Sequence, residues 1–112
     1  MDTGEPGTRA SIHLHDDDRC HGRPLFSEIV HRAAEEGLTG ATVLHGCEGY
    51  GASGALHTER LVSSWERTPA EVVLIDRPDR IAAFLDQLGP LIAGCPVVLS
   101  EVRILHGSRP AE

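Results

Sequence analysis

The chain contains no lysine, because all ten of its basic residues are arginines. This absence excludes a lysine Schiff base and the lysine that holds phosphate in a P-loop. Any bound anion must therefore be held by arginine side chains or by backbone amides. The formal net charge of −7 also disfavours a nucleic-acid partner, because phosphate backbones bind to dense basic surfaces.

Long apolar segments and cysteine pairs are missing as well. No apolar run reaches the length that spans a membrane, and the polar segment 1–9 has no signal-peptide core. The three cysteines, Cys20, Cys47 and Cys95, are an odd number at wide spacing and include no CxxC pair. We therefore expect a reducing, cytoplasmic setting and no direct insertion into a membrane.

Aromatic residues are scarce, with one Trp, one Tyr and two Phe, so the core must be built from Leu, Val, Ile and Ala. The length of 112 residues suits a single domain. Polar ends rich in Gly and Pro predict flexible tails over 1–9 and 106–112, which leaves residues 10–105 for the domain.

The spacing of apolar residues predicts the order βαββαβ. Strands are predicted from the alternation in 11–15, the β-prone run 41–44, the apolar run 70–76 and the segment 97–105. Helical spacing predicts one helix over 24–36 and a second from Asp79 to Gly94, with a bend or break at Pro90. The segment 52–68 fits a short helix and an extended arm equally well.

This order predicts an α+β, ferredoxin-like fold, in which a four-stranded antiparallel sheet carries both helices on one face. No third layer remains in the sequence to cover the other face. We therefore expect an oligomer whose subunits pack sheet against sheet.

Glycines punctuate the stretch from Gly40 to Gly54, where they also occur at positions 46, 49 and 51. Such a stretch allows the chain to bend sharply out of a strand, and it also frees backbone amides to approach an anion. Both interpretations fit the pattern. In either case the second predicted strand leads into a mobile loop.

Three segments resemble the PII-like proteins, the uncharacterised family related to the nitrogen regulator PII and to CutA. They are DRCHGRPL at 18–25, GATVLHGCEGYG at 40–51 and LHT at 56–58. The resemblance extends from about Ile12 to Ile104. It implies a ferredoxin-like homotrimer that binds an adenine nucleotide (ATP, ADP, AMP or a cyclic dinucleotide) or a similar small ligand in the clefts between subunits. It also implies a segment like the PII T-loop, which changes shape with bound nucleotide and docks onto target proteins.

The match to PII is partial in its chemistry. Gly40 and Thr42 fit the first part of the PII loop motif, and residues 49–51 fit its Gly-Phe-Gly after one extra residue. PII clamps phosphates with lysines. Here the residue after Pro69 is Ala70, and the chain has no lysine at any position. Tyr50 does not occupy the place of the loop tyrosine that PII modifies, so uridylylation is not expected. The resemblance therefore supports the architecture better than the ligand.

Candidate ligand-binding residues supply flexible backbone, side chains that hydrogen-bond, or guanidinium groups that fork onto a phosphate. They are Thr42, Gly46, Gly49, Tyr50, Gly51, His57, Arg19, Arg23 and Arg103. Arg19 and Arg23 also fit a simpler interpretation as solvated partners of the aspartates at 16–18. Arg103 lies near the end of the last predicted strand, where PII places nucleotide contacts.

Two alternative functions stay open. His13 and His15 project from the same face of the first predicted strand, near Asp16, and this set favours a CutA-like metal-binding trimer as the first alternative. The second alternative is an adaptor that docks onto a membrane transporter or channel independently of nucleotide.

A catalytic role is not expected. Ser53, Cys47 and His45 supply the chemistry of a nucleophile and a base, but the sequence shows no carboxylate that orients them. A surface serine, a small buried cysteine and a strand histidine explain these residues more simply. We therefore expect a regulatory protein and not an enzyme.

Overall fold

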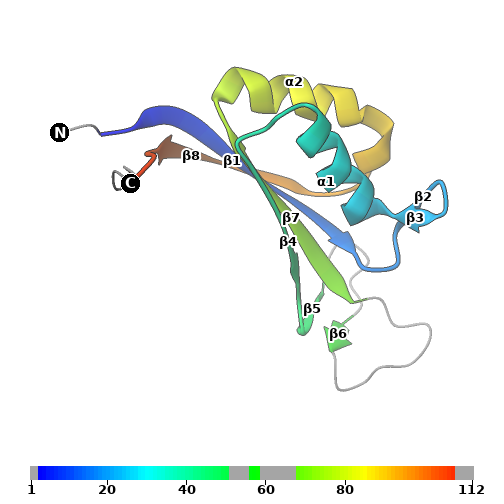
Figure 1. Ribbon diagram of the computed structural model, residues 1–112. Coiled ribbons are helices and arrows are strands. Elements are labelled where there is room, and N and C mark those ends of the chain that lie inside the picture. The colour runs from blue at the N-terminus through cyan, green and yellow to red at the C-terminus, as the bar shows by residue number, and fades with distance from the viewer. Residues whose placement is uncertain (1–2, 51–55, 59–67, 108–112) are drawn as a thin grey trace, which may run out of the picture.

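A four-stranded antiparallel sheet in the order β4-β7-β1-β8 forms the centre of the computed structural model, which describes residues 3–50, 56–58 and 68–107. The inner strands are β1 (Glu5–His15) and β7 (Pro69–Asp76), and the edge strands are β4 (Gly40–His45) and β8 (Val97–Ile104). Two helices, α1 (Leu25–Glu35) and α2 (Pro78–Leu88), lie together over one face of this sheet (Figure 1). The predicted ferredoxin-like fold is confirmed.

The core lies between the helices and the sheet. Strand alternation directs Ala10, Ile12 and Leu14 of β1 towards the helices, and each is at most 4% exposed. Ile29 from α1 and Phe84 from α2 pack into the same cluster. Phe84 is the only aromatic residue among the fully buried core residues of the described part, so the core is aliphatic, as the scarcity of aromatics predicts.

Prolines and glycines set the helix boundaries close to those predicted. Pro24 (φ −57°) directly precedes α1, and Pro78 occupies the first turn of α2, where its missing N–H costs no helical hydrogen bond. Helix α2 ends at Leu88, and a short 3₁₀ helix, η2 (Gly89–Ile92), follows it. The predicted break at Pro90 is confirmed, because a proline cannot continue the α-helical ladder. Within the described ranges, no helix is long and apolar enough to cross a membrane.

The N-terminal part of the chain differs from the prediction. Its Gly and Pro content favours a tail over 1–9, but β1 begins at Glu5, which pairs with Ile104 of β8. Pairing with β7 starts only at Thr8, so Pro6 has a neighbouring strand on one side alone, a position where proline is tolerated. Long-range pairing with β8 therefore overrides the local composition. At the other end, residues 108–112 of the expected tail lie outside the described residues.

Two short ladders accompany the main sheet. β2 (Arg19–Cys20) and β3 (Arg23–Pro24) form a hairpin between β1 and α1, turning through His21 (φ 51°) and Gly22 (φ 82°). Positive φ at both turn positions matches the tight turn that suits a two-residue hairpin. β5 (Glu48–Tyr50) pairs with β6 (Leu56–Thr58), and this pair, the arm hairpin, projects past the end of the sheet (Figure 1). Of the segment 52–68, residues 56–58 are therefore extended, while 52–55 and 59–67 lie outside the described residues.

Candidate functional site

The predicted ligand residues do not converge within one chain. Gly46 follows β4, whose last residue His45 pairs with Ala70 of β7, level with Leu14 of β1. Arg103 lies on β8 at the opposite edge of the sheet, paired with Pro6. Leu14 and Pro6 are separated by about 26 Å along β1 at the usual rise of a strand. The candidates therefore form two groups, one at the base of the arm hairpin and one near the start of β1.

The base of the arm hairpin is fastened to the turn that follows β1. The N–H of Asp16 donates to the carbonyl of Thr68 (2.8 Å), and its carboxylate Oδ1 lies 2.7 Å from Nδ1 of His45. His45 ends β4 and Thr68 directly precedes β7, so Asp16 contacts both limbs of the chain that leads into and out of the arm hairpin. The ring of Phe26, on α1, meets the His45 ring edge to face at a centroid distance of 5.2 Å.

Asp16 supplies the carboxylate that the sequence does not reveal for His45, because the two residues are 29 positions apart. The expectation that no carboxylate orients His45 is therefore wrong. This contact alone does not build a catalytic group. His45 has no hydrogen bond to Cys47 within the described part of the chain, and Ser53 lies outside it. Cys47 itself is exposed, not buried as expected.

Gly46 has a structural role that the sequence does not distinguish from a ligand role. Its N–H donates to the carbonyl of Pro69 (2.9 Å), so in this conformation that amide is not free for an anion. A Cβ at this position would lie 2.9 Å from Cγ of Pro69, which is closer than real Cβ atoms come to a neighbour. Glycine is therefore required at position 46 by the close approach of β7.

The remaining arm-side candidates lie on β4 and on the arm hairpin. Thr42 is exposed on the sheet face away from the helices, opposite Val73. The arm hairpin pairs Gly49 with His57 and Tyr50 with Leu56, so it brings these candidates together along the backbone. Gly51 lies outside the described residues.

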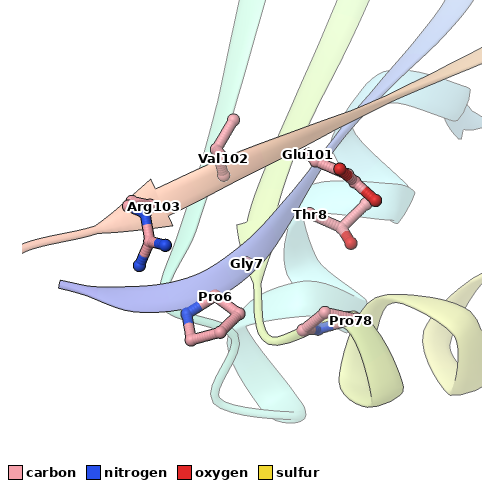
Figure 2. Close-up of a pocket in the computed structure, with 7 residues that line it drawn as sticks. All are labelled: Pro6, Gly7, Thr8, Pro78, Glu101, Val102 and Arg103. Atoms are coloured by element: carbon pink, nitrogen blue, oxygen red, sulfur yellow. The ribbon is translucent and has the colours of Figure 1, made fainter.

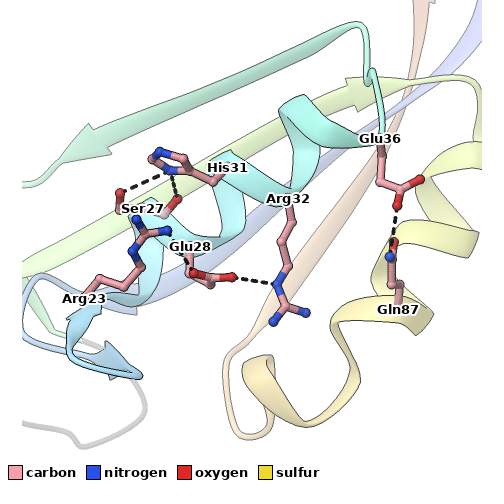
Figure 3. A network of polar contacts seen from close by, with 7 residues as sticks. All are labelled: Arg23, Ser27, Glu28, His31, Arg32, Glu36 and Gln87. Atoms are coloured by element: carbon pink, nitrogen blue, oxygen red, sulfur yellow. Dashed lines mark hydrogen bonds and ion pairs between the residues drawn. The ribbon is translucent and has the colours of Figure 1, made fainter.

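Arg23 belongs to an ion-pair network on α1. Its guanidinium lies 3.3 Å from one carboxylate oxygen of Glu28, and Nε of Arg32 lies 2.9 Å from the other (Figure 3). Hydrogen bonds from Arg32 and then from Arg23 lower the pKa of Glu28, and Glu28 in turn raises the pKa of Arg32. The simpler interpretation of Arg23 as an ion-pair partner therefore holds, but with Glu28 and not with the aspartates at 16–18. Arg19 is exposed on β2.

The alternative metal site is not assembled. Within the described ranges, no group of three His, Cys, Asp or Glu side chains is placed to hold a metal ion. His13 and His15 share the sheet face away from the helices, because they alternate with the buried residues of β1. Asp16 turns its carboxylate to His45, which packs against α1 on the other face. The expected set of His13, His15 and Asp16 is therefore divided between the two faces.

A cavity of about 480 Å³ lies where the helix layer ends. It is lined by Pro6, Gly7, Thr8, Pro78, Glu101, Val102 and Arg103 (Figure 2). Strand alternation places Glu101 and Arg103 on the helix-side face of β8, opposite Thr8 and Pro6. In the part of the chain that the structure describes, Pro78 at the start of α2 is the only helical residue that lines the cavity, so these side chains border an open hollow.

The lining of this cavity contains one acidic and one basic side chain, Glu101 and Arg103. Glu101 and Arg103 are both exposed, and neither side chain has an ion pair or hydrogen bond with the described residues. The sequence points to Arg103 but not to Glu101 or Thr8. The available signal is the alternation Glu101-Val102-Arg103, which places both charged groups on one face once the strand is recognised. The volume falls in the range of small-ligand pockets, roughly 300–1,000 Å³.

The comparisons with known proteins agree with this architecture. The model of the DUF190 family (Uncharacterized ACR, COG1993) matches residues 7–104. The UPF0166 protein of Aquifex aeolicus (strain VF5) is 28% identical over 95 residues, covering 85% of this chain and 90% of that protein.

Two solved structures of a PII-like protein are similar in fold. CPII, a nitrogen regulatory PII-like protein from Thiomonas intermedia K12 bound to ADP, AMP and bicarbonate, superposes with a TM-score of 0.64 at 13% identity, covering 88% of each chain. CPII bound to ADP and bicarbonate gives 0.58 at 14% identity, again over 88% of each chain. The chain therefore belongs to the DUF190 family and has the PII-like fold that the resemblance implies.

Proposed function

We propose that the protein is a PII-like regulator that binds an adenine nucleotide between the subunits of a homotrimer and signals through the segment from Gly49 to Thr68. The observation that carries the proposal is the separation of the candidate residues into two groups. One chain cannot surround a small ligand with both groups, because they lie about 26 Å apart along the sheet. A second copy that brings its arm-base group to the cavity at Arg103 completes one site.

The sheet face away from the helices supports the oligomer. Leu44 on one edge strand and Val98 on the other are 49% and 53% exposed, although both are large apolar residues. Complete burial of such side chains contributes about 1.5–3 kcal/mol each. Within the described residues, both edge strands also present unpaired backbone groups, which are templates for pairing with another chain. Packing of this face between subunits would bury these groups together.

The arm base supports signalling. Asp16 contacts the limb that enters the arm hairpin and the limb that leaves it, and the β2–β3 hairpin begins three residues after it. A ligand at this end of the sheet is therefore well placed to shift the equilibrium of the segment from Gly49 to Thr68 through its differential affinity for two arrangements. Target proteins would read that arrangement.

The adenine nucleotide is supported by the fold neighbour, which was solved with ADP and AMP. Isothermal titration calorimetry with AMP, ADP, ATP and cyclic dinucleotides tests this assignment. We expect saturable binding of at least one adenine nucleotide. Absence of any heat of binding at millimolar nucleotide would reject the proposal.

Mixed oligomers test whether the site is shared. Arg103→Ala removes the cation of the cavity, and the double variant Arg19→Ala/Arg23→Ala removes those near the arm base. Each variant alone should lose binding. Co-refolding equal amounts of the two variants should restore about a quarter of the sites. A cleft is intact only where a subunit that keeps Arg103 meets a neighbour that keeps Arg19 and Arg23, and in a randomly assembled trimer about half of the subunits satisfy each condition. A site built within one chain would give no recovery.

A further inference from the structure

The cavity at the start of β1 offers little positive charge to a ligand. Its lining contains one cation, Arg103, and one anion, Glu101, together with the hydroxyl of Thr8. The other lining residues are Pro6, Gly7, Pro78 and Val102, which carry no charge. The charges of the lining side chains therefore cancel.

Neighbouring cations are turned away or already paired. Arg9 alternates with the buried Ala10, so it lies on the other face of β1. Nε of Arg77 lies 3.9 Å from the carboxylate of Asp79, and Arg80 is held 3.3 Å from the carboxylate of Asp76. None of these side chains lines the cavity, so among the described residues Arg103 alone supplies its positive charge.

A second subunit brings further contacts but adds no net positive charge. If its arm-base group meets the cavity, it brings Arg19, but also the aspartates at 16–18 that directly precede β2. Its Arg23 is already paired with Glu28. The chain has no lysine, and the described residues place no second arginine in the lining of the cavity to neutralise a polyphosphate.

We propose that Glu101 makes this site selective for a nucleoside monophosphate over the corresponding di- and triphosphates, an inference that rests on the proposed nucleotide function. A phosphate monoester carries about two negative charges near neutral pH, and each further phosphoryl group adds about one more. One guanidinium matches a single phosphoryl group by a bidentate contact. A di- or triphosphate carries additional charge that no second guanidinium of the described lining balances, and Glu101, two residues from Arg103 on the same face of β8, repels that charge.

Glu101 and Thr8 also define how the ligand is oriented. They face each other across the β1–β8 ladder, while Arg103 faces Pro6 one step along the same face (Figure 2). A ligand whose phosphate contacts Arg103 places its hydroxyl or amino donors at the carboxylate and hydroxyl acceptors of Glu101 and Thr8. The site therefore recognises an anion at one end and donors at the other, as a nucleoside monophosphate presents them.

Calorimetry of the wild type and Glu101→Gln with AMP, ADP and ATP tests this inference, in EDTA so that no metal ion neutralises the phosphates. The wild type should bind AMP tightest and ATP weakest. Removing the charge should strengthen ATP binding about tenfold and AMP binding about threefold at most. Glu35→Gln, an exposed carboxylate of α1, is the matched control and should change neither affinity.

The outcomes separate the two proposals. If the wild type binds nucleotides but Glu101→Gln leaves the ratio of AMP to ATP affinity within twofold, the selectivity role of Glu101 is wrong and the nucleotide function stands. If the wild type binds no nucleotide, both fall. If Arg103→Gln leaves AMP affinity unchanged, the phosphate is held elsewhere and the proposed orientation of the ligand is wrong.

Discussion

The imidazole of His45 and the carboxylate of Asp16 are joined across 2.7 Å at the point where the main sheet gives way to the arm hairpin. Both side chains are partly exposed, at 53% for His45 and 37% for Asp16, so water screens the pair. The contact is therefore a weak restraint on the arm base and not a buried anchor. Weak restraints of this kind are suited to a segment that changes arrangement.

Asp16→Ala, His45→Ala and the double variant should form a mutant cycle with a coupling energy of about 0.5 kcal/mol, in the range of exposed pairs. His45→Ala also removes the edge contact with Phe26, so it should cost more stability than Asp16→Ala. Urea unfolding of the four proteins measures these values. His45→Phe is the control, because it keeps a ring beside Phe26 and loses only the polar contact. Equal costs for the two single alanine variants would contradict this assignment.

Gly46→Ala should destabilise the protein by about 1–2 kcal/mol, because its Cβ would lie 2.9 Å from the rigid ring of Pro69. Gly40→Ala, at the start of the same strand, is the matched control: its Cβ would meet Ile75 at an ordinary 3.9 Å. In thermal unfolding, Gly40→Ala should therefore have nearly the melting temperature of the wild type, and Gly46→Ala should have a lower one. Equal stability of the two variants would show that the close approach at position 46 relaxes without cost.

Much of the fold follows from short-range patterns in the sequence. The β-strand 70–76 and the helix that breaks at Pro90 are recognisable because apolar spacing and proline geometry act within a few residues. The extension of β1 to Glu5 is not recognisable, because its stabilisation comes from Ile104 at the far end of the chain. Local composition therefore mispredicts an element when a distant strand supplies the hydrogen bonds.

In the candidate site, too, the residues are recognisable from local patterns, but their long-range contacts are not. Arg103 is found through a family resemblance, and its neighbour Glu101 follows from strand alternation only after the strand is placed. The pairing of Asp16 with His45 depends on the turn after β1 meeting the end of β4. The sequence shows an aspartate and a histidine but not that they are in contact. It therefore suggests a metal site of His13, His15 and Asp16, whose side chains the structure places on two different faces of the sheet.

Glu28→Gln should make stability less dependent on pH. The two arginines lower the pKa of Glu28 in the folded state, so its contribution is present above the ordinary value of 4.5 and is lost as pH falls through the lower folded pKa. The difference in unfolding free energy between wild type and Glu28→Gln should therefore be largest at neutral pH and vanish in acid. Urea unfolding between pH 7 and pH 3 measures it, with Asp86→Asn on the exposed side of α2 as the control. If the difference in unfolding free energy instead grew as the pH fell, the pKa of Glu28 would be raised and not lowered in the folded state, which would contradict the ion-pair network.

Leu44→Asp or Val98→Asp should dissociate the proposed oligomer, because each places a charge on the sheet face that lies away from the helices. Ala82→Asp, on an exposed position of α2, should leave the assembly unchanged. Light scattering coupled to size-exclusion chromatography gives the mass directly. Oligomers of unchanged mass in both sheet variants would place the subunit contact elsewhere.

Among these substitutions, Asp76→Ala should lower the free energy of unfolding most, by about 3 kcal/mol. Asp76 ends β7 and is 2% exposed, and its carboxylate accepts hydrogen bonds from the amides of Thr39 (3.0 Å) and Arg77 (2.6 Å). It also faces the guanidinium of Arg80 at 3.3 Å, so alanine would leave two amides without their acceptor and would remove the ion-pair partner of Arg80, which keeps its bond to the carbonyl of Glu36. Arg80→Ala should cost less, because its own side chain is 34% exposed and the two amide bonds to Asp76 remain. If Asp76→Ala is too unstable for a complete urea curve, Asp76→Asn, which retains one carbonyl acceptor, should fall between it and the wild type. Asp76→Ala no worse than Arg80→Ala would show that the amide bonds contribute little and that this carboxylate does not hold the end of α1 to the start of α2.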